Sequence, residues 1–173
     1  MATIDTQMVN NAAPNFNQQV GQDNATAQPT NLEAQISTQM ENWTKEVTQM
    51  NEMLKTLPKT DELLNTIYSS RQKCVESFYG VNSIILTQSK EYKRVAVQTF
   101  NNIKQSGYNG VRYTTDAGIN KIVETLLEDR KHIIDVLSNY INYLKDTIAT
   151  IDNIIYGINQ KVKIHEMLNN IKF

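Results

Sequence analysis

The chain has 173 residues, of which 40% are hydrophobic, and a formal net charge of -1 from 17 Lys and Arg against 18 Asp and Glu. So balanced a charge argues against a general polyanion binder, and the low apolar content argues against a large compact core. A single cysteine, Cys74, excludes an intrachain disulfide and a multi-cysteine zinc site, and we expect its side chain to be buried.

The distribution of prolines indicates the fold class. The three prolines are at positions 14, 29 and 58, so that Lys59 to Phe173 contains none. So long a span without proline favours helices. We therefore predict an all-α chain. No apolar run is long enough to cross a bilayer, and the first 28 residues contain no Lys or Arg. We expect no membrane association, no signal peptide and a cytoplasmic location, which is the host cytoplasm if a phage encodes the chain.

Residues 1–30 are rich in Asn and Gln and poor in large apolar residues, which predicts a disordered tail. Residues 31–57 then show a heptad repeat and predict a helix, with Thr30 and Glu33 spaced to cap it and Pro58 to end it. The apolar positions of this repeat are Leu32, Ile36, Met40, Trp43, Val47, Met50, Leu54 and Leu57.

Residues 60–105 predict one long helix that begins at Thr60 and contains a basic stretch. At 1.5 Å per residue such a helix is about 65 Å long, which suits an elongated hairpin, a coiled coil or an oligomer. Residues 106–115 predict a loop, in which Gly107 and Gly110 are suited to positive φ. Thr115 and Asp116 then start a single C-terminal helix over 116–173.

The apolar repeat of this C-terminal helix is the strongest in the chain and predicts a seam for homo-oligomerisation, in a ring or a bundle. Its residues alternate in steps of four and three: Leu137, Ile141, Leu144, Ile148, Ile151, Ile155, Ile158 and Val162. We expect polar residues at positions 148 and 155 to abolish association.

No motif for catalysis, nucleotide binding or metal binding is present. His132 and His165 are far apart and belong to no spaced ligand set, and Glu124, Glu128 and Asp129 are more typical of a solvated helix face. We therefore expect a protein that is not an enzyme and has no metal or cofactor.

The stretch SKEYKRVAVQTFNNIKQSGYNGVRYTTDAG, residues 89–118, is the main candidate for a working surface. Its residues 89–113 belong to a segment, residues 58–113, that has eight Lys and Arg against four Asp and Glu. Basic residues contact phosphates, and aromatic rings stack on bases. The candidate nucleic-acid-binding residues are Lys90, Lys93, Arg94, Lys104 and Arg112 for phosphates, with Tyr108 and Tyr113 for stacking. Equally open is a solvated helix end and turn, in which the tyrosines pack.

The text EYKRVAVQTFNNIKQSGYNG, the linker VRYTTDAG and the long helix after it resemble the UvsY recombination mediators of tailed phages, over about residues 68–173. The resemblance implies a ring-forming, non-enzymatic protein of DNA recombination and repair. Such a protein binds single-stranded DNA and helps a RecA-like recombinase replace a single-stranded-DNA-binding protein. The alternative is a helical structural or scaffold protein, for instance of a phage particle.

Overall fold

The computed structural model describes residues 29–56 and 60–170, and over these residues it has four helices and no strand. They are α1 (Pro29–Thr56), α2 (Thr60–Ser106), α3 (Asp116–Leu126) and α4 (Glu128–Asn170). The prediction of an all-α chain is therefore confirmed. Most of the predicted tail, Pro58, and the side chains of Thr30 and Thr60 lie outside the described residues.

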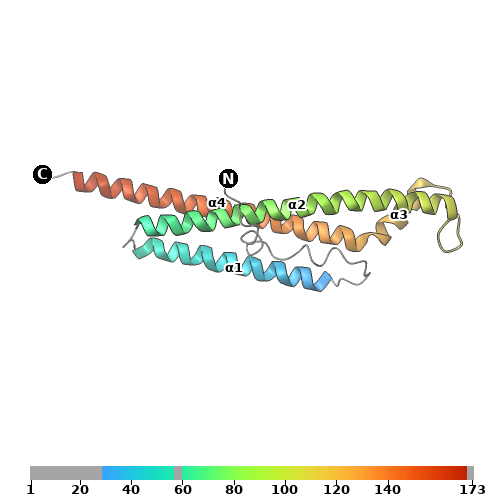
Figure 1. The fold of residues 1–173 in the computed structure, drawn as a ribbon, viewed down its shortest axis with the longest axis horizontal. Coiled ribbons are helices and arrows are strands. Elements are labelled where there is room, and N and C mark those ends of the chain that lie inside the picture. The colour runs from blue at the N-terminus through green and yellow to red at the C-terminus, as the bar shows by residue number, and fades with distance from the viewer. Residues whose placement is uncertain (1–28, 57–59, 171–173) are drawn as a thin grey trace, which may run out of the picture.

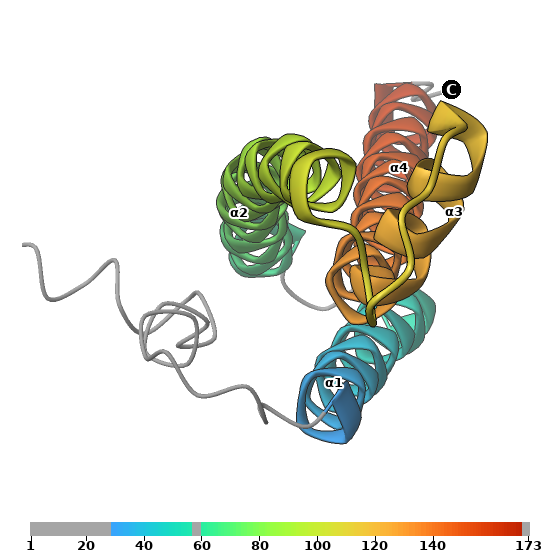
Figure 2. The ribbon, with the colours of Figure 1, turned by 90° about the vertical axis from the view of Figure 1, so that its right-hand side faces the viewer.

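The helices form an elongated rod in which α4 is the central element (Figure 1). The pairs His132–Glu33 and Lys161–Leu54 join α4 to α1 at both ends of α1, so these two helices run in the same direction. Arg71 in α2 pairs with Asp152 in α4, and α2 runs antiparallel to both partners. Seen along the rod, α1 and α2 lie on different sides of α4 (Figure 2).

The main hydrophobic core lies along the line where α1 and α2 meet α4. Each helix contributes residues from its own apolar repeat, and the three repeats interlock. The buried members are Ile36, Trp43 and Met50 from α1; Ile67, Cys74 and Val81 from α2; and Leu137, Tyr140, Ile141, Leu144, Ile151, Ile154 and Ile158 from α4. Burying a large aliphatic side chain contributes about 1.5–3 kcal/mol. The three apolar seams are therefore satisfied within one chain.

This packing gives the predicted oligomerisation residues a different role. Leu137, Ile141, Leu144, Ile151 and Ile158 are buried in the main core, while Ile148, Ile155 and Val162 are partly buried and pack against it. Their partner helices in the structure are α1 and α2 of the same chain, which have the same repeat and fold back onto α4. An interface between chains at these residues stays a prediction, and it would require α1 and α2 to leave α4.

A second, smaller core lies at the far end of α2, where α3 folds back against it. Ile103, Ile119, Val123 and Leu127 are its buried members. Between α2 and α3 the chain turns through Gly107 and Gly110, whose φ angles of 78° and 77° match the positive values expected of them. The side chain of Thr115 accepts a hydrogen bond from the backbone N–H of Gly118 and caps α3, as predicted.

The single helix expected over 116–173 is instead two helices. Leu127 leaves helical geometry, with φ -111° and ψ 13°, and its buried side chain joins the second core. Glu128 and Asp129 follow in the first turn of α4, where acidic side chains favour a helix start. The break lets α3 pack against α2 while α4 continues along the main core.

Candidate functional site

Lys90 and Lys93 lie in the C-terminal half of α2 and are exposed. Neither forms an ion pair or hydrogen bond with another described residue. Arg112, in the loop after α2, is exposed and also lacks such a partner among the described residues. These three cations are therefore available to an external anion.

Arg94 is occupied by an acidic neighbour one helical turn away. Its Nε and Nη2 atoms donate to the two carboxylate oxygens of Glu91 at 2.8 and 2.6 Å, and its Nη1 donates to Gln98 at 3.2 Å. The hydrogen bond from Arg94 lowers the pKa of Glu91 below its ordinary value, and the same bond raises the pKa of Arg94. A phosphate would have to displace Glu91 before it could bind this guanidinium.

Lys104 is also paired. Its Nζ donates to Asp116 Oδ1 at 3.0 Å and lies 5.5 Å from the centre of the Phe100 ring. The ion pair connects the end of α2 to the start of α3. Lys104 thus helps to close the turn between two helices, and its charge is partly neutralised there.

The two tyrosines proposed for base stacking serve the fold. Tyr108 and Tyr113 are half-buried and pack against the second core, beside Ile103 and Ile119. Backbone hydrogen bonds of 2.9 and 3.0 Å between Tyr108 and Val111 fix the turn that holds Tyr108. Of the seven predicted nucleic-acid-binding residues, only Lys90, Lys93 and Arg112 are exposed and have no partner within residues 29–56 and 60–170. Neither tyrosine is an exposed aromatic platform.

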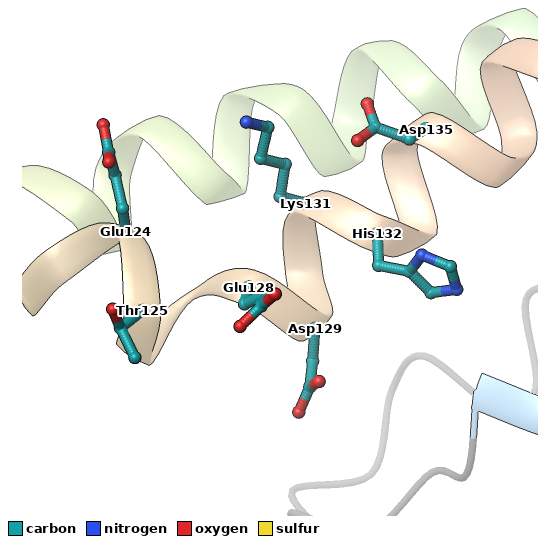
Figure 3. A pocket seen from close by; sticks show the side chains of 7 residues that line it. All are labelled: Glu124, Thr125, Glu128, Asp129, Lys131, His132 and Asp135. Carbon is teal, nitrogen blue, oxygen red and sulfur yellow. The ribbon is translucent and has the colours of Figure 1, made fainter. Parts of the chain in front are cut away.

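A surface hollow of about 520 Å³ lies outside the elbow between α3 and α4. Its side chains diverge (Figure 3): Glu124, Lys131 and Asp135 point to one side, and Glu128 and Asp129 to the other. The described residues contain no group of three or more His, Cys, Asp or Glu side chains placed to hold a metal ion. Glu124, Glu128 and Asp129 are all exposed to solvent.

His132 borders the same hollow but is engaged elsewhere. Its Nε2 lies 2.8 Å from Oε1 of Glu33, near the start of α1. This contact fastens α1 to the beginning of α4. A smaller hollow of about 300 Å³ separates α1 from α2, where the Ser70 hydroxyl donates to the Glu46 carboxylate. Neither hollow pairs a nucleophile with a base.

A feature that the sequence reasoning missed is the outward side of α2, the side that faces away from α4. Tyr68, Tyr79, Leu86 and Val97 are exposed there by 49%, 65%, 64% and 61%. Their spacings of 11, 7 and 11 residues place them on one line along a helix with 3.6 residues per turn. The same spacing was readable in the sequence, where the stronger inward repeat obscured it.

A second exposed apolar group lies at the other end of the rod. The last turns of α4 extend beyond α1 and α2 (Figure 1), and they expose Ile164, Met167 and Leu168. No helix in the described parts of the chain is both long enough and apolar enough to cross a bilayer.

Comparisons with protein-family models, with curated proteins and with solved structures found no match to this chain. The resemblance to the UvsY mediators gains no support from them and stays a hypothesis.

Proposed function

We propose that this chain is a non-enzymatic structural protein that assembles with other protein chains through the exposed sides of its long helices. The observation that carries the proposal is the outward line of Tyr68, Tyr79, Leu86 and Val97 on α2. Large apolar side chains aligned on one exposed face are a feature of protein interfaces. The inward repeats, by contrast, are already used by the core.

The polar chemistry of the described residues is consistent with this proposal. Arg71, Arg94 and Lys104 hold carboxylates of the same chain, and His132 is held by Glu33. Such surface pairs orient helix ends and loops and contribute little stability, on the order of 0–1 kcal/mol each. They leave no arrangement of acid, base and nucleophile around either hollow.

Light scattering of the purified full-length chain over a dilution series tests the assembly role. The proposal predicts a mass above the 19.8 kDa of one chain at high concentration, with return to that mass on dilution. The assembly role would be contradicted by a chain that stays monomeric at every concentration and that also binds single-stranded DNA as a monomer.

A second candidate function is single-strand binding of the kind that the UvsY resemblance implies, including loading of a RecA-like recombinase. The observation that favours it is the trio Lys90, Lys93 and Arg112, exposed and unpaired among the described residues. Three phosphate contacts would give a slope of about -2 in a plot of log affinity against log salt, at about 0.7 per contact for single strands.

Fluorescence anisotropy of a labelled single-stranded oligonucleotide tests this candidate. If the lysines bind phosphate, Lys90→Ala with Lys93→Ala should weaken binding and flatten the salt dependence. Lys163→Ala, which removes an exposed lysine from the far end of α4, is the matched control and should leave both unchanged. Absence of binding at low salt would exclude this function.

A further inference from the structure

The outward line on α2 is part of a longer stripe with regular spacing. From Leu86 towards the start of α2 the stripe takes steps of 4, 3, 4, 3 and 4 residues, and it takes the same steps towards the end of α2. The full stripe is Tyr68, Gln72, Val75, Tyr79, Asn82, Leu86, Lys90, Lys93, Val97, Phe100 and Lys104. The average step is 3.6 residues, so the stripe runs straight along the helix.

The two halves of this stripe differ in chemistry. The half before Leu86 has two exposed tyrosines, Tyr68 and Tyr79, and the half after it has three exposed lysines, at positions 90, 93 and 104. None of its positions is occupied by an acidic residue. The stripe also faces away from α4, because Ile67, Cys74 and Val81, the buried residues through which α2 packs in the main core, lie about 100–140° round the helix from Leu86.

We propose that this stripe is a two-fold symmetric interface at which a second copy of the chain packs its own α2 antiparallel to the first. The inference rests on the proposed assembly role and names the partner for it. In a two-fold interface residue i of one copy meets residue j of the other, and j meets i. With the axis at Leu86, each stripe position meets the stripe position that lies equally far on the other side of Leu86.

The resulting pairs are complementary. Tyr79 meets Lys93, whose ammonium group is unpaired among the described residues, and this places a cation at an aromatic ring twice in the dimer. Tyr68 meets Lys104, whose ammonium group is already held by Asp116 and adds less. Leu86 meets its own copy. A parallel arrangement in register would instead place each lysine against the same lysine, which is repulsive. The positions of the tyrosines and lysines therefore select the antiparallel orientation.

Two further pairs support the same register. Val75 meets Val97, which joins two aliphatic side chains across the axis. Glu76 and Arg94 flank the stripe on one side, and the antiparallel register brings Glu76 of one copy within about 3 Å, along the helix axis, of Arg94 of the other. Opposite charges at such flanking positions favour one register of paired helices.

The size of the stripe predicts a moderate affinity. From Tyr68 to Lys104 it is about 54 Å long, and a helix presents a strip about 10 Å wide, so each copy covers roughly 540 Å². A standard stable interface takes about 800 Å² from each partner. The dimer should therefore dissociate on dilution.

The test uses the full-length chain and compares Leu86→Lys with Tyr156→Lys in sedimentation velocity. Leu86 and Tyr156 are exposed by 64% and 65%, so both variants should keep the helical circular dichroism of the parent. We expect Leu86→Lys to abolish the dimer, because it places two lysines together at the axis, and Tyr156→Lys to keep it. A dimer that persists in Leu86→Lys would place the interface elsewhere and overturn this inference, while the assembly role would stand.

Cross-linking tests the orientation independently. Chains with Tyr79→Cys and chains with Lys93→Cys should form a mixed disulfide when combined, and neither should cross-link to itself, because like positions lie about 21 Å apart along the axis. Native Cys74 is fully buried and should not interfere. Self-cross-linking of Tyr79→Cys would overturn the antiparallel arrangement. A monomer that binds a single-stranded oligonucleotide through Lys90 and Lys93 would overturn both this inference and the assembly role.

Discussion

Replacing Ile151 by alanine tests whether the apolar seam of α4 stabilises one chain or joins several. Ile151 is fully buried in the core between α4 and its partners α1 and α2. Truncating such a residue removes buried apolar atoms and leaves a cavity, at a cost of about 2–5 kcal/mol. For a chain of this size each kcal/mol lowers the Tm by about 2–4 °C, so the expected loss is on the order of 10 °C.

Ile164→Ala is the matched control, because Ile164 is the same residue type on the same helix and is 55% exposed. Its effect on the free energy of unfolding should stay within about 0.5 kcal/mol, since it lies outside both cores. Thermal and urea unfolding followed by circular dichroism give the two stabilities. Sedimentation on the same samples gives their masses.

The expected result is that Ile151→Ala loses stability at unchanged association, while Ile164→Ala keeps its stability. The reasoning would be refuted if Ile151→Ala dissociated an oligomer and left each chain as stable as before. That outcome would return the α4 seam to the interface between chains that the sequence repeat suggested. Equal destabilisation by the two variants would also contradict the assignment of Ile151 to the core.

The remaining predictions concern alkaline stability and the turn after α2. Burial raises the pKa of Cys74 from 9.0, and that of Tyr140 from 10.0, to about 12 in each case. As the pH rises, the unfolded state therefore releases these protons before the folded state does. The free energy of unfolding of the protein should fall between about pH 9 and 12, by up to about 1.4 kcal/mol per pH unit for each group. Cys74→Ala should flatten this slope in urea titrations, and an unchanged slope would count against the burial argument. Gly107→Ala should destabilise by about 1–3 kcal/mol, because φ is +78° and the added Cβ would lie 2.5 Å from the Val111 carbonyl oxygen. Gly80→Ala, in open space on α2, should raise the stability by up to about 1 kcal/mol, and equal effects in the two variants would refute the explanation.

The features that the sequence predicted correctly depend on local interactions. Thr115 caps α3 through a side chain that reaches three residues ahead, and Gly107 and Gly110 adopt the positive φ that their lack of a Cβ permits. Cys74 is buried because it lies on the inward repeat of a helix. Each of these outcomes follows from spacing within a few residues.

The features that the sequence did not predict depend on contacts between distant segments. A heptad repeat indicates that a helix needs a partner, but it does not distinguish another segment of the chain from another copy. Tyr143 shows the difference, since its hydroxyl donates to the Met40 carbonyl oxygen at 2.7 Å, 103 residues away. The second core, which covers Tyr108 and Tyr113, likewise needs α3 to fold back.

The pairing of Arg94 with Glu91 could have been predicted from the sequence. Glu91 stands three residues before Arg94 on a helix, a spacing at which opposite charges meet. The outward stripe on α2 was also present as a period of 3.6 residues around Leu86. The spacing of Glu91 and Arg94 and the stripe around Leu86 are both less conspicuous in the sequence than the inward repeat of α2, which is more hydrophobic.

The most direct test of the central claim, assembly through protein surfaces, is sedimentation velocity of the full-length chain mixed with a dye-labelled single-stranded oligonucleotide. Protein absorbance and dye absorbance are followed separately, at low salt and over a range of protein concentrations. The account predicts that the protein sediments faster as its concentration rises and that the oligonucleotide sediments alone. Oligonucleotide that sediments with a monomeric chain would contradict the account and favour the nucleic-acid-binding function.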